Sequence, residues 1–199
     1  MNIILSLEKL ILKIQNYIYK RYNKLLFKSP NITVGKNFCI RNKIYLRINE
    51  NSHLTIGDNF TYNSGDFLNP IARNIRGGFF LNKNSQVSIG NNVGISSSCI
   101  RSNISITIGD RVKIGADTII MDTDAHNLNF LERRNDKTDG PKAKNKPIII
   151  EDDVLIGTRC IILKGVHIGA RSIIGSGSIV TKDIPSDSIA AGNPCKVLK

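Results

Sequence analysis

The chain has 199 residues, enough for one domain of ordinary size, and carries a formal net charge of +12. With no tryptophan, few aromatic residues and abundant isoleucine, it predicts an aliphatic core. The charge favours an anionic partner, such as a nucleic acid, a membrane surface or a phosphorylated small molecule.

Residues 1–28 predict a basic amphipathic helix that ends before Pro30. Glu8, Lys9 and Lys13 interrupt its apolar residues, so we expect neither a signal peptide nor a membrane-spanning segment. Two interpretations stay open. The helix could cover the open first coil of the domain or pack against a neighbouring subunit, or it could lie on an anionic membrane surface.

The four cysteines are far apart in the chain, which argues against a zinc or redox site and fits a reduced cytosolic compartment. They are Cys39, Cys99, Cys160 and Cys195. We expect them to be small buried apolar residues.

From residue 112 the sequence repeats every six residues, as VKIGAD, TIIMDT and, after a gap, VLIGTR, CIILKG, VHIGAR, SIIGSG and SIVTKD. The first and third residues of each unit would share one face of a short strand, so we expect both to point inward. The third residues are Ile114, Ile120, Ile156, Ile162, Ile168, Ile174 and Val180, and the first residues are Val112, Thr118, Val154, Cys160, Val166, Ser172 and Ser178. Weaker units begin at Ile32, Leu54, Val87 and Ile106.

Such a regular period predicts an all-β solenoid, a parallel β-helix whose short strands stack on the coil below. Glycine often follows the third residue, as at Gly115, Gly157, Gly169 and Gly175, where we expect tight corners.

Residues 121–149 interrupt the repeat with polar residues and predict one long loop, after which Ile150 resumes the pattern. Long ordered loops in compact domains usually carry function. This loop holds His126, one of three histidines in the chain.

The C-terminal tail, residues 184–199, follows the last regular repeat. The strings GSIVTKDIP and AGNPCKV resemble the end of the galactoside and maltose acetyltransferases. From about residue 30 onward the chain resembles the hexapeptide-repeat acyltransferases. The resemblance implies a left-handed parallel β-helix over residues 30–199 behind an N-terminal helix over residues 1–29, although the usual crossover rule would favour the right-handed form.

The resemblance assigns roles to two residues of the expected site, and a third group must orient the first of them. His126, at the start of the loop, would be the general base that takes the proton of the acceptor hydroxyl. The backbone N–H of Thr158 would stabilise the oxyanion of the tetrahedral intermediate. Asp124 or Asp122 could orient the imidazole, although a backbone carbonyl could serve as well.

The resemblance also implies acetyl-CoA as co-substrate, bound in a groove between two subunits of a homotrimer. Its expected contacts are Thr158, Ser176, Thr181, Lys182, Lys196 and Lys199. The lysines would meet phosphates as charged donors, although two of these positions are commonly arginine in the relatives. No metal is expected, because His53 and His167 do not lie at zinc-ligand spacing from His126.

These observations favour a cytoplasmic O-acetyltransferase that acts on a sugar hydroxyl of a cell-surface polysaccharide or its precursor. Galactoside specificity does not transfer, because the first half of the chain lacks counterparts of the galactoside-binding residues. An N-acetyltransferase of an amino nucleotide-sugar, a serine or antibiotic acetyltransferase and a non-catalytic scaffold stay open. Nucleic-acid binding would rest on charge alone, without a motif. A lipid-linked acceptor at the inner membrane face would suit the basic helix.

Overall fold

The computed structural model describes residues 3–65, 71 and 75–199. The chain begins with helix α1 (Ile3–Leu26) and then winds through three parallel sheets. Residues 1 and 2 of the expected helix lie outside the described residues. The predicted all-β solenoid with an N-terminal helix is confirmed.

Each coil contributes one short strand to each of three sheets, which we call A, B and C. Sheet A contains β1 (Ile32–Val34), β4 (His53–Ile56), β7 (Gln86–Ile89), β10 (Ser105–Ile108), β13 (Ile148–Ile150) and β16 (His167–Ile168). Sheet B contains β2 (Cys39–Arg41), β5 (Thr61–Asn63), β8 (Gly94–Ser96), β11 (Lys113–Ile114), β14 (Leu155–Ile156), β17 (Ile173–Ile174), β19 (Ile189–Ala191) and β20 (Lys196–Val197). Sheet C contains β3 (Tyr45–Ile48), β6 (Gly78–Leu81), β9 (Cys99–Ser102), β12 (Ile119–Met121), β15 (Ile161–Ile162) and β18 (Ile179–Val180).

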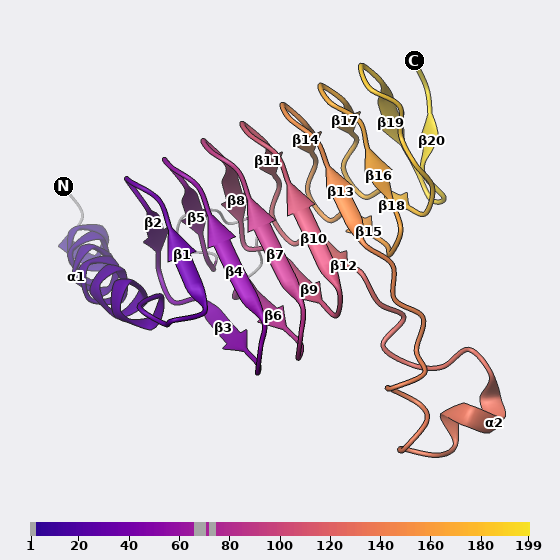
Figure 1. Ribbon diagram of the computed structural model, residues 1–199. Coiled ribbons are helices and arrows are strands. Elements are labelled where there is room, and N and C mark those ends of the chain that lie inside the picture. The colour runs from indigo at the N-terminus through magenta and orange to yellow at the C-terminus, as the bar shows by residue number, and fades with distance from the viewer. Residues whose placement is uncertain (1–2, 66–70, 72–74) are drawn as a thin grey trace.

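Among the strands of the described residues, every pair is parallel except β19 with β20, which lies at the C-terminal end. In Figure 1 the front strands β4, β7 and β10 run upward, the chain returns behind them, and successive coils advance toward the right. This winding is left-handed, as the resemblance implied.

The register places like residues above one another along the solenoid. Ile108 pairs with Ile89 on one side and with Ile150 on the other, and Ile150 pairs in turn with Ile168. The first and third residues of the repeat units from residue 112 onward are all buried, as predicted. Each coil therefore adds a layer of aliphatic side chains to one continuous core.

The N-terminal end of the core is aromatic, whereas the composition predicted an aliphatic core. The rings of Phe38, Phe60, Tyr62 and Phe79 pack in a row inside the first coils, and Phe27 from the end of α1 joins them. Large rings fill the interior of coils whose repeat is irregular, and Phe27 closes the open first coil.

Glycine is required at these corners because a side chain would collide with the next coil, and not because the backbone is left-handed there. A Cβ on Gly115 would lie 2.6 Å from the carbonyl carbon of Gly157, and one on Gly157 would lie 2.6 Å from the backbone nitrogen of Ser176. The left-handed backbone falls elsewhere, on residues such as Asn59 (φ 57°) and Asp153 (φ 60°). Gly115, Gly157, Gly169 and Gly175 lie at the corners, as expected, but the close stacking of coils rather than a left-handed backbone requires glycine there.

The predicted loop leaves the solenoid after β12 and re-enters at Ile148, two residues earlier than expected, because Ile148 is already buried in sheet A. Its base is closed by an antiparallel bridge between Thr123 and Asn145. A single helical turn, α2 (Phe130–Arg133), lies at its far end. Figure 1 shows the loop projecting well away from the solenoid.

Candidate functional site

A tight turn at the base of the loop presents His126. The N–H of Ala125 donates to Thr123 Oγ1 at 2.9 Å, and the N–H of His126 donates to the carbonyl of Asp124 at 2.7 Å. Ala125 adopts a left-handed backbone (φ 62°), which is unfavourable for a residue with a Cβ. Such strain is often found where a turn must aim a functional side chain.

The imidazole of His126 is held by a carboxylate from the second half of the loop. His126 Nδ1 lies 2.6 Å from Asp139 Oδ2, and the N–H of Asn127 donates to Asp139 Oδ1 at 2.8 Å. The Asp139 side chain is only 15% exposed, whereas that of His126 is 69% exposed. The carboxylate is therefore fixed within the loop, and the ring faces outward.

The protonation of this pair follows from its geometry. The hydrogen bond from His126, followed by the one from the Asn127 N–H, lowers the pKa of Asp139 below its ordinary value. An ionised carboxylate only accepts hydrogen bonds, so Nδ1 is the nitrogen that donates its proton to Asp139. The lone pair of Nε2 is then free to take a proton from a substrate.

The expectation that Asp122 or Asp124 orients the imidazole was wrong. Asp124 instead pairs with Lys164, with its Oδ1 2.5 Å from the Lys164 Nζ. Asp122 is fully buried and accepts hydrogen bonds from the Ser102 hydroxyl and from two backbone N–H groups between β9 and β10. Both aspartates hold the base of the loop on the solenoid, and Asp139 takes the position beside the ring.

A groove of about 390 Å³ runs along sheet B and its corner with sheet C. Thr158 and Ser176 line it, together with residues of earlier coils that include Asn63, Ser96 and Lys113. The structure thus brings together two of the predicted coenzyme A contacts. The Thr158 N–H donates to Ser176 Oγ at 3.2 Å, a long hydrogen bond that a substrate oxyanion could replace when the hydroxyl rotates.

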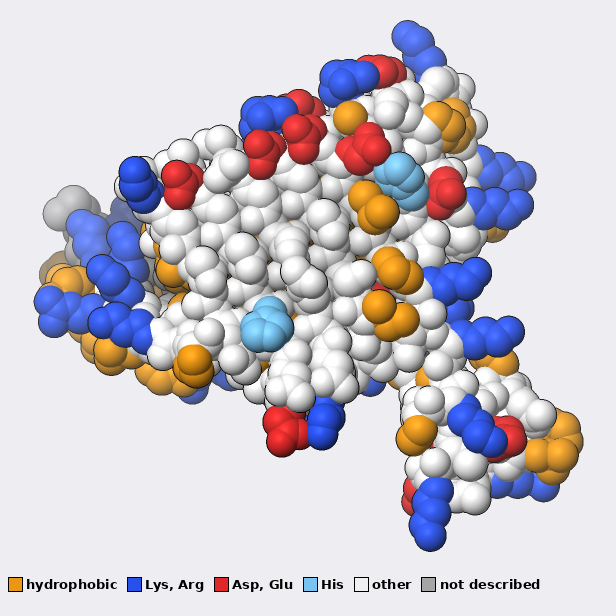
Figure 2. Space-filling view, in the orientation of Figure 1, with side chains coloured by type: hydrophobic (Ala, Val, Ile, Leu, Met, Phe, Trp, Pro, Cys, Tyr) orange, Lys and Arg blue, Asp and Glu red, His pale blue; other side chains and the backbone are white. Residues whose placement is uncertain are grey.

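The other predicted coenzyme A contacts lie on two separate parts of the last coils, and all four are exposed. Thr181 and Lys182 follow β18 at the corner between sheets C and A, whereas Lys196 lies in β20 and Lys199 next to β19. The side chains of Lys182, Lys196 and Lys199 have no acidic partner in the described parts of the chain. Figure 2 shows basic side chains along this C-terminal end of the molecule.

His126 and Thr158 lie at different corners of the same chain. Thr158 follows β14 of sheet B, and its neighbour Arg159 donates to Ala116 in the coil below. His126 follows β12, after the chain has crossed the whole of sheet C. At about 3.3 Å per residue, this crossing separates the two corners by roughly 15 Å or more. One chain therefore does not bring its own His126 to its own Thr158.

The remaining histidines and the cysteines form no second site. His53 and His167 both lie on sheet A, and His167 pairs with Glu151 at 2.8 Å. Over residues 3–65, 71 and 75–199, no group of three or more His, Cys, Asp or Glu side chains could hold a metal ion. Cys160 and Cys195 are buried, as expected, but Cys99 is exposed and Cys39 is half-buried, so the expectation of four buried cysteines was wrong for these two. Burial raises the pKa of the Cys160 thiol, which disfavours the reactive thiolate.

The sequence matches a family profile described as the hexapeptide repeat of succinyl-transferase, at residues 86–121 and 147–182. These two segments form the coils on either side of the loop. Over these two segments the chain is similar to the hexapeptide-repeat transferases. The strings of the C-terminal tail pointed to the same group of proteins.

Two solved structures that are similar to this chain contain an acyl carrier, coenzyme A in one and acetyl coenzyme A in the other. Galactoside acetyltransferase in complex with coenzyme A is 28% identical, with a TM-score of 0.59 over 100% of this chain and 83% of that one. A hexapeptide-repeat acetyltransferase of Vibrio cholerae, complexed with acetyl coenzyme A, is 35% identical, with a TM-score of 0.54 over 61% of this chain and 63% of that one.

Two further proteins from these comparisons transfer acyl groups to nitrogen. AntD, an N-acyltransferase of Bacillus cereus solved with dTDP and 3-hydroxybutyryl-CoA, has a TM-score of 0.66 at 19% identity over 90% of this chain and 86% of that one, and so shares the fold. A 2,3,4,5-tetrahydropyridine-2,6-dicarboxylate N-acetyltransferase of Staphylococcus aureus is 55% identical over 53 residues, 27% of this chain. The matching segment spans 22% of that relative's length.

Sequence reasoning missed Asp139 because its partner lies thirteen residues away across an irregular loop. No repeat or motif spacing in the loop pairs these two positions. The only indication was that Asp139 stands among the polar residues that interrupt the hexapeptide pattern.

Proposed function

We propose that this protein is an acetyl-CoA-dependent O-acetyltransferase that acts on a sugar hydroxyl of a cell-surface polysaccharide or its precursor. The pair of His126 and Asp139 carries the proposal, because it leaves an outward-facing basic nitrogen on the loop. The likeness to two acetyltransferases solved with coenzyme A or acetyl coenzyme A supports the choice of donor.

In the proposed reaction the acceptor oxygen attacks the carbonyl carbon of the acetyl thioester while His126 Nε2 takes the hydroxyl proton. The Thr158 N–H, released from Ser176, donates to the oxyanion of the tetrahedral intermediate. The carbon–sulfur bond then breaks, and the proton on Nε2 passes to the departing thiolate. No acyl-enzyme forms, so a thiol nucleophile is not needed.

We place the complete site between two subunits of a homotrimer. The separation of His126 from Thr158 within one chain supports this arrangement, since only another copy can bring a histidine to the groove. Three exposed apolar residues on the loop, Leu128, Phe130 and Leu131, would gain a contact in such an assembly. Thr181 and Lys182 would then meet coenzyme A at a different subunit boundary from Lys196 and Lys199.

An N-acetyltransferase of an amino nucleotide-sugar is the second candidate. The N-acyltransferase with dTDP shares the fold over most of the chain, and the Staphylococcus aureus relative acetylates nitrogen. The same base and oxyanion donor would serve an amine acceptor. The need for a supported base favours oxygen, because a hydroxyl must lose its proton as it attacks.

The test is thiol release from acetyl-CoA with a panel of sugars, nucleotide-sugars and glycan fragments, for the wild type beside His126→Ala. We expect release that depends on the acceptor and falls about 10²- to 10⁴-fold in the variant, while coenzyme A still binds. Product NMR then separates O- from N-acetylation. Near-normal turnover in His126→Ala would contradict the role of His126 as the general base. If the wild-type protein did not bind acetyl-CoA, the proposal that it is an acetyltransferase would be wrong.

A further inference from the structure

Helix α1 has two faces, and only one of them is covered by the solenoid. Asn23 on the inner face is buried and donates from Nδ2 to the carbonyls of Ile40 and Asn42, and Phe27 follows it into the core. The outer face carries an apolar stripe at helical spacing with side chains between 49% and 68% exposed. Its members are Ile4, Leu7, Ile11, Ile14, Ile18 and Leu25.

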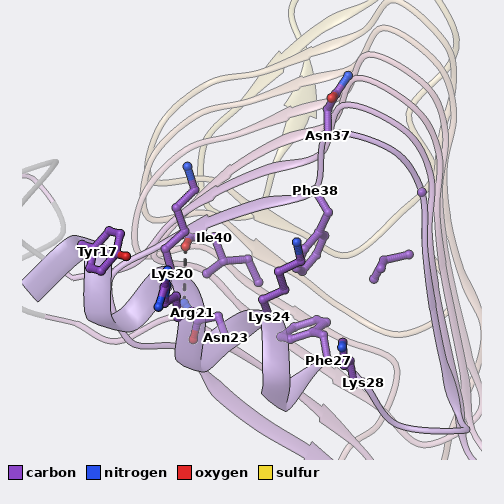
Figure 3. Close-up of a pocket in the computed structure, with 12 residues that line it drawn as sticks. Tyr17, Lys20, Arg21, Asn23, Lys24, Phe27, Lys28, Asn37, Phe38 and Ile40 are labelled. Carbon is purple, nitrogen blue, oxygen red and sulfur yellow. Dashed lines mark hydrogen bonds between the residues drawn. The ribbon is translucent and has the colours of Figure 1, made fainter.

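A cavity of about 540 Å³ lies between the second half of α1 and the first coil, and no residue of the stripe lines it. Four cations line it, Lys20, Arg21, Lys24 and Lys28, and no acidic residue does. Figure 3 shows the amino groups of Lys20 and Lys24 extending from the helix toward the corner that carries Asn37 and Phe38. The cavity combines positive charge with apolar and aromatic walls.

None of these four cations has an acidic partner in the described parts of the chain. Arg21 stacks on the ring of Tyr17 at 4.7 Å, and the three lysines have no ion pair. Three arginines elsewhere in the described chain, Arg111, Arg159 and Arg171, do pair with aspartates, and Arg171 contacts Asp187 at 2.6 Å. Unpaired cations around one cavity favour an anionic ligand such as a phosphate group.

A second copy of the helix fits this surface poorly. Residues 3–28 carry six basic side chains against one acidic side chain, Glu8, so two copies would repel each other. Arg21 also continues the apolar stripe three residues after Ile18, where it would enter the seam between paired helices. An anionic lipid surface complements the same charge and accepts the apolar stripe as well.

We propose that α1 docks this protein on an anionic lipid surface. The stripe from Ile4 to Ile18 enters the boundary between headgroups and acyl chains, and Lys20 and Lys24 bind headgroup phosphates at the cavity. The helix lies in the surface and does not cross it, and no described helix is long and apolar enough to span a membrane. The inference is independent of the proposed transfer reaction.

The test is flotation of the full-length protein with vesicles of phosphatidylcholine alone, or with about one lipid in three replaced by phosphatidylglycerol. The main variant is Lys20→Ala with Lys24→Ala. The matched control is Lys137→Ala with Lys144→Ala, which removes the same charge from the exposed loop. A third variant, Ile11→Gln with Ile14→Gln, removes apolar contact without changing charge. Circular dichroism establishes that each variant is folded.

We expect binding to the anionic vesicles only, reduced about 30-fold in the Lys20 and Lys24 variant and several-fold in the isoleucine variant, with the loop control close to wild type. If the loop control lost vesicle binding equally, the loss would reflect only the change in net charge, and the proposal would be wrong. Displacement by millimolar glycerol 3-phosphate would also contradict it, because it would indicate a site for a free phosphate. A changed oligomeric size in the isoleucine variant, without vesicle binding by the wild type, would assign the stripe to a second copy. Thiol release with a soluble acceptor should stay unchanged in the Lys20 and Lys24 variant, so this test and that of the transferase can fail separately.

Discussion

Asp139 lies thirteen residues after His126 and reaches its ring only because the loop folds back on itself. Several contacts within the loop fix this return. Glu132 pairs with Lys142 at 2.9 Å, and the Asn127 side chain donates to the carbonyl of Lys142 at 3.1 Å. The orientation of the base therefore depends on the loop as a folded unit.

Asp139→Asn tests the function of this carboxylate. The side-chain amide keeps the shape but can donate to Nδ1, which would move the imidazole proton to Nε2 and block the base. We expect acceptor-dependent thiol release to fall about 10²- to 10⁴-fold in kcat, with the KM for acetyl-CoA unchanged. Steady-state kinetics at neutral pH measures both.

Asp124→Asn is the matched control for that variant. It weakens the ion pair with Lys164 at the base of the loop but leaves the contact between His126 and Asp139 in place. We expect a lower melting temperature and a loss of kcat that is much smaller than for Asp139→Asn. If Asp124→Asn lost as much kcat as Asp139→Asn, the role given to Asp139 would be wrong.

The stacking of coils sets a limit on side-chain size at the corners. In Gly115→Ala the new Cβ would meet the backbone of Gly157 and Thr158 at 2.6 Å, and a backbone does not give way as a flexible side chain does. We expect a loss of about 1–3 kcal/mol in the free energy of unfolding, from strain between neighbouring coils. Urea denaturation followed by circular dichroism measures this loss.

Gly140→Ala provides the comparison, because nothing lies within 4 Å of its ideal Cβ in the loop. We expect a change within about 0.5 kcal/mol. Equal effects at the two positions would show that close stacking of coils is not the reason for the glycine at 115.

At one corner of the solenoid, the type of side-chain contact between neighbouring coils changes along the chain. Asn37, Asn59 and Asn92 form a ladder of side-chain amides, and later coils replace it with ion pairs of Arg111 with Asp153 and of Arg171 with Asp187. All of these residues have a left-handed backbone. In both ion pairs the arginine contacts the carboxylate through two nitrogens.

These ion pairs give the stability of the fold a dependence on pH. The hydrogen bond from the arginine lowers the pKa of Asp153 and of Asp187 in the folded state. Their contribution is complete above the unfolded pKa of about 3.9 and is lost as the pH falls through the lower folded value. We expect the double variant Asp153→Asn with Asp187→Asn to melt earlier than wild type at pH 7 and to lose less stability below about pH 4.

Melting curves recorded from pH 7 to pH 3 measure this dependence at low salt. The control is Asp136→Asn, since the Asp136 carboxylate has no partner in the described parts of the chain. It should follow the wild-type curve. If the double variant also followed the wild-type curve, solvent screening would cancel the contribution of the two ion pairs to stability.

Across the whole molecule, the sequence predicted the structural features that follow a regular spacing of residues and missed those that do not. The inward residues followed from the six-residue period, because every coil solves the same packing problem. The aromatic end of the core and the return of Asp139 to His126 have no period. The helical spacing of α1 was predicted, but not which of its faces the solenoid leaves exposed. Each depends on contacts between segments with no common pattern, so only the three-dimensional arrangement reveals them.

The position of His126 and Thr158 at different corners predicts a shared active site, which mixed trimers can test. One chain carries His126→Ala, and the other carries Ser176→Phe, which blocks the groove. Each pure trimer should be inactive. In trimers refolded from an equal mixture, an intact groove meets an intact histidine at about one boundary in four, so about a quarter of wild-type activity should return. A site within one chain would leave every mixed trimer inactive. Native mass spectrometry confirms that the chains have mixed, so an inactive mixture would count against the shared site.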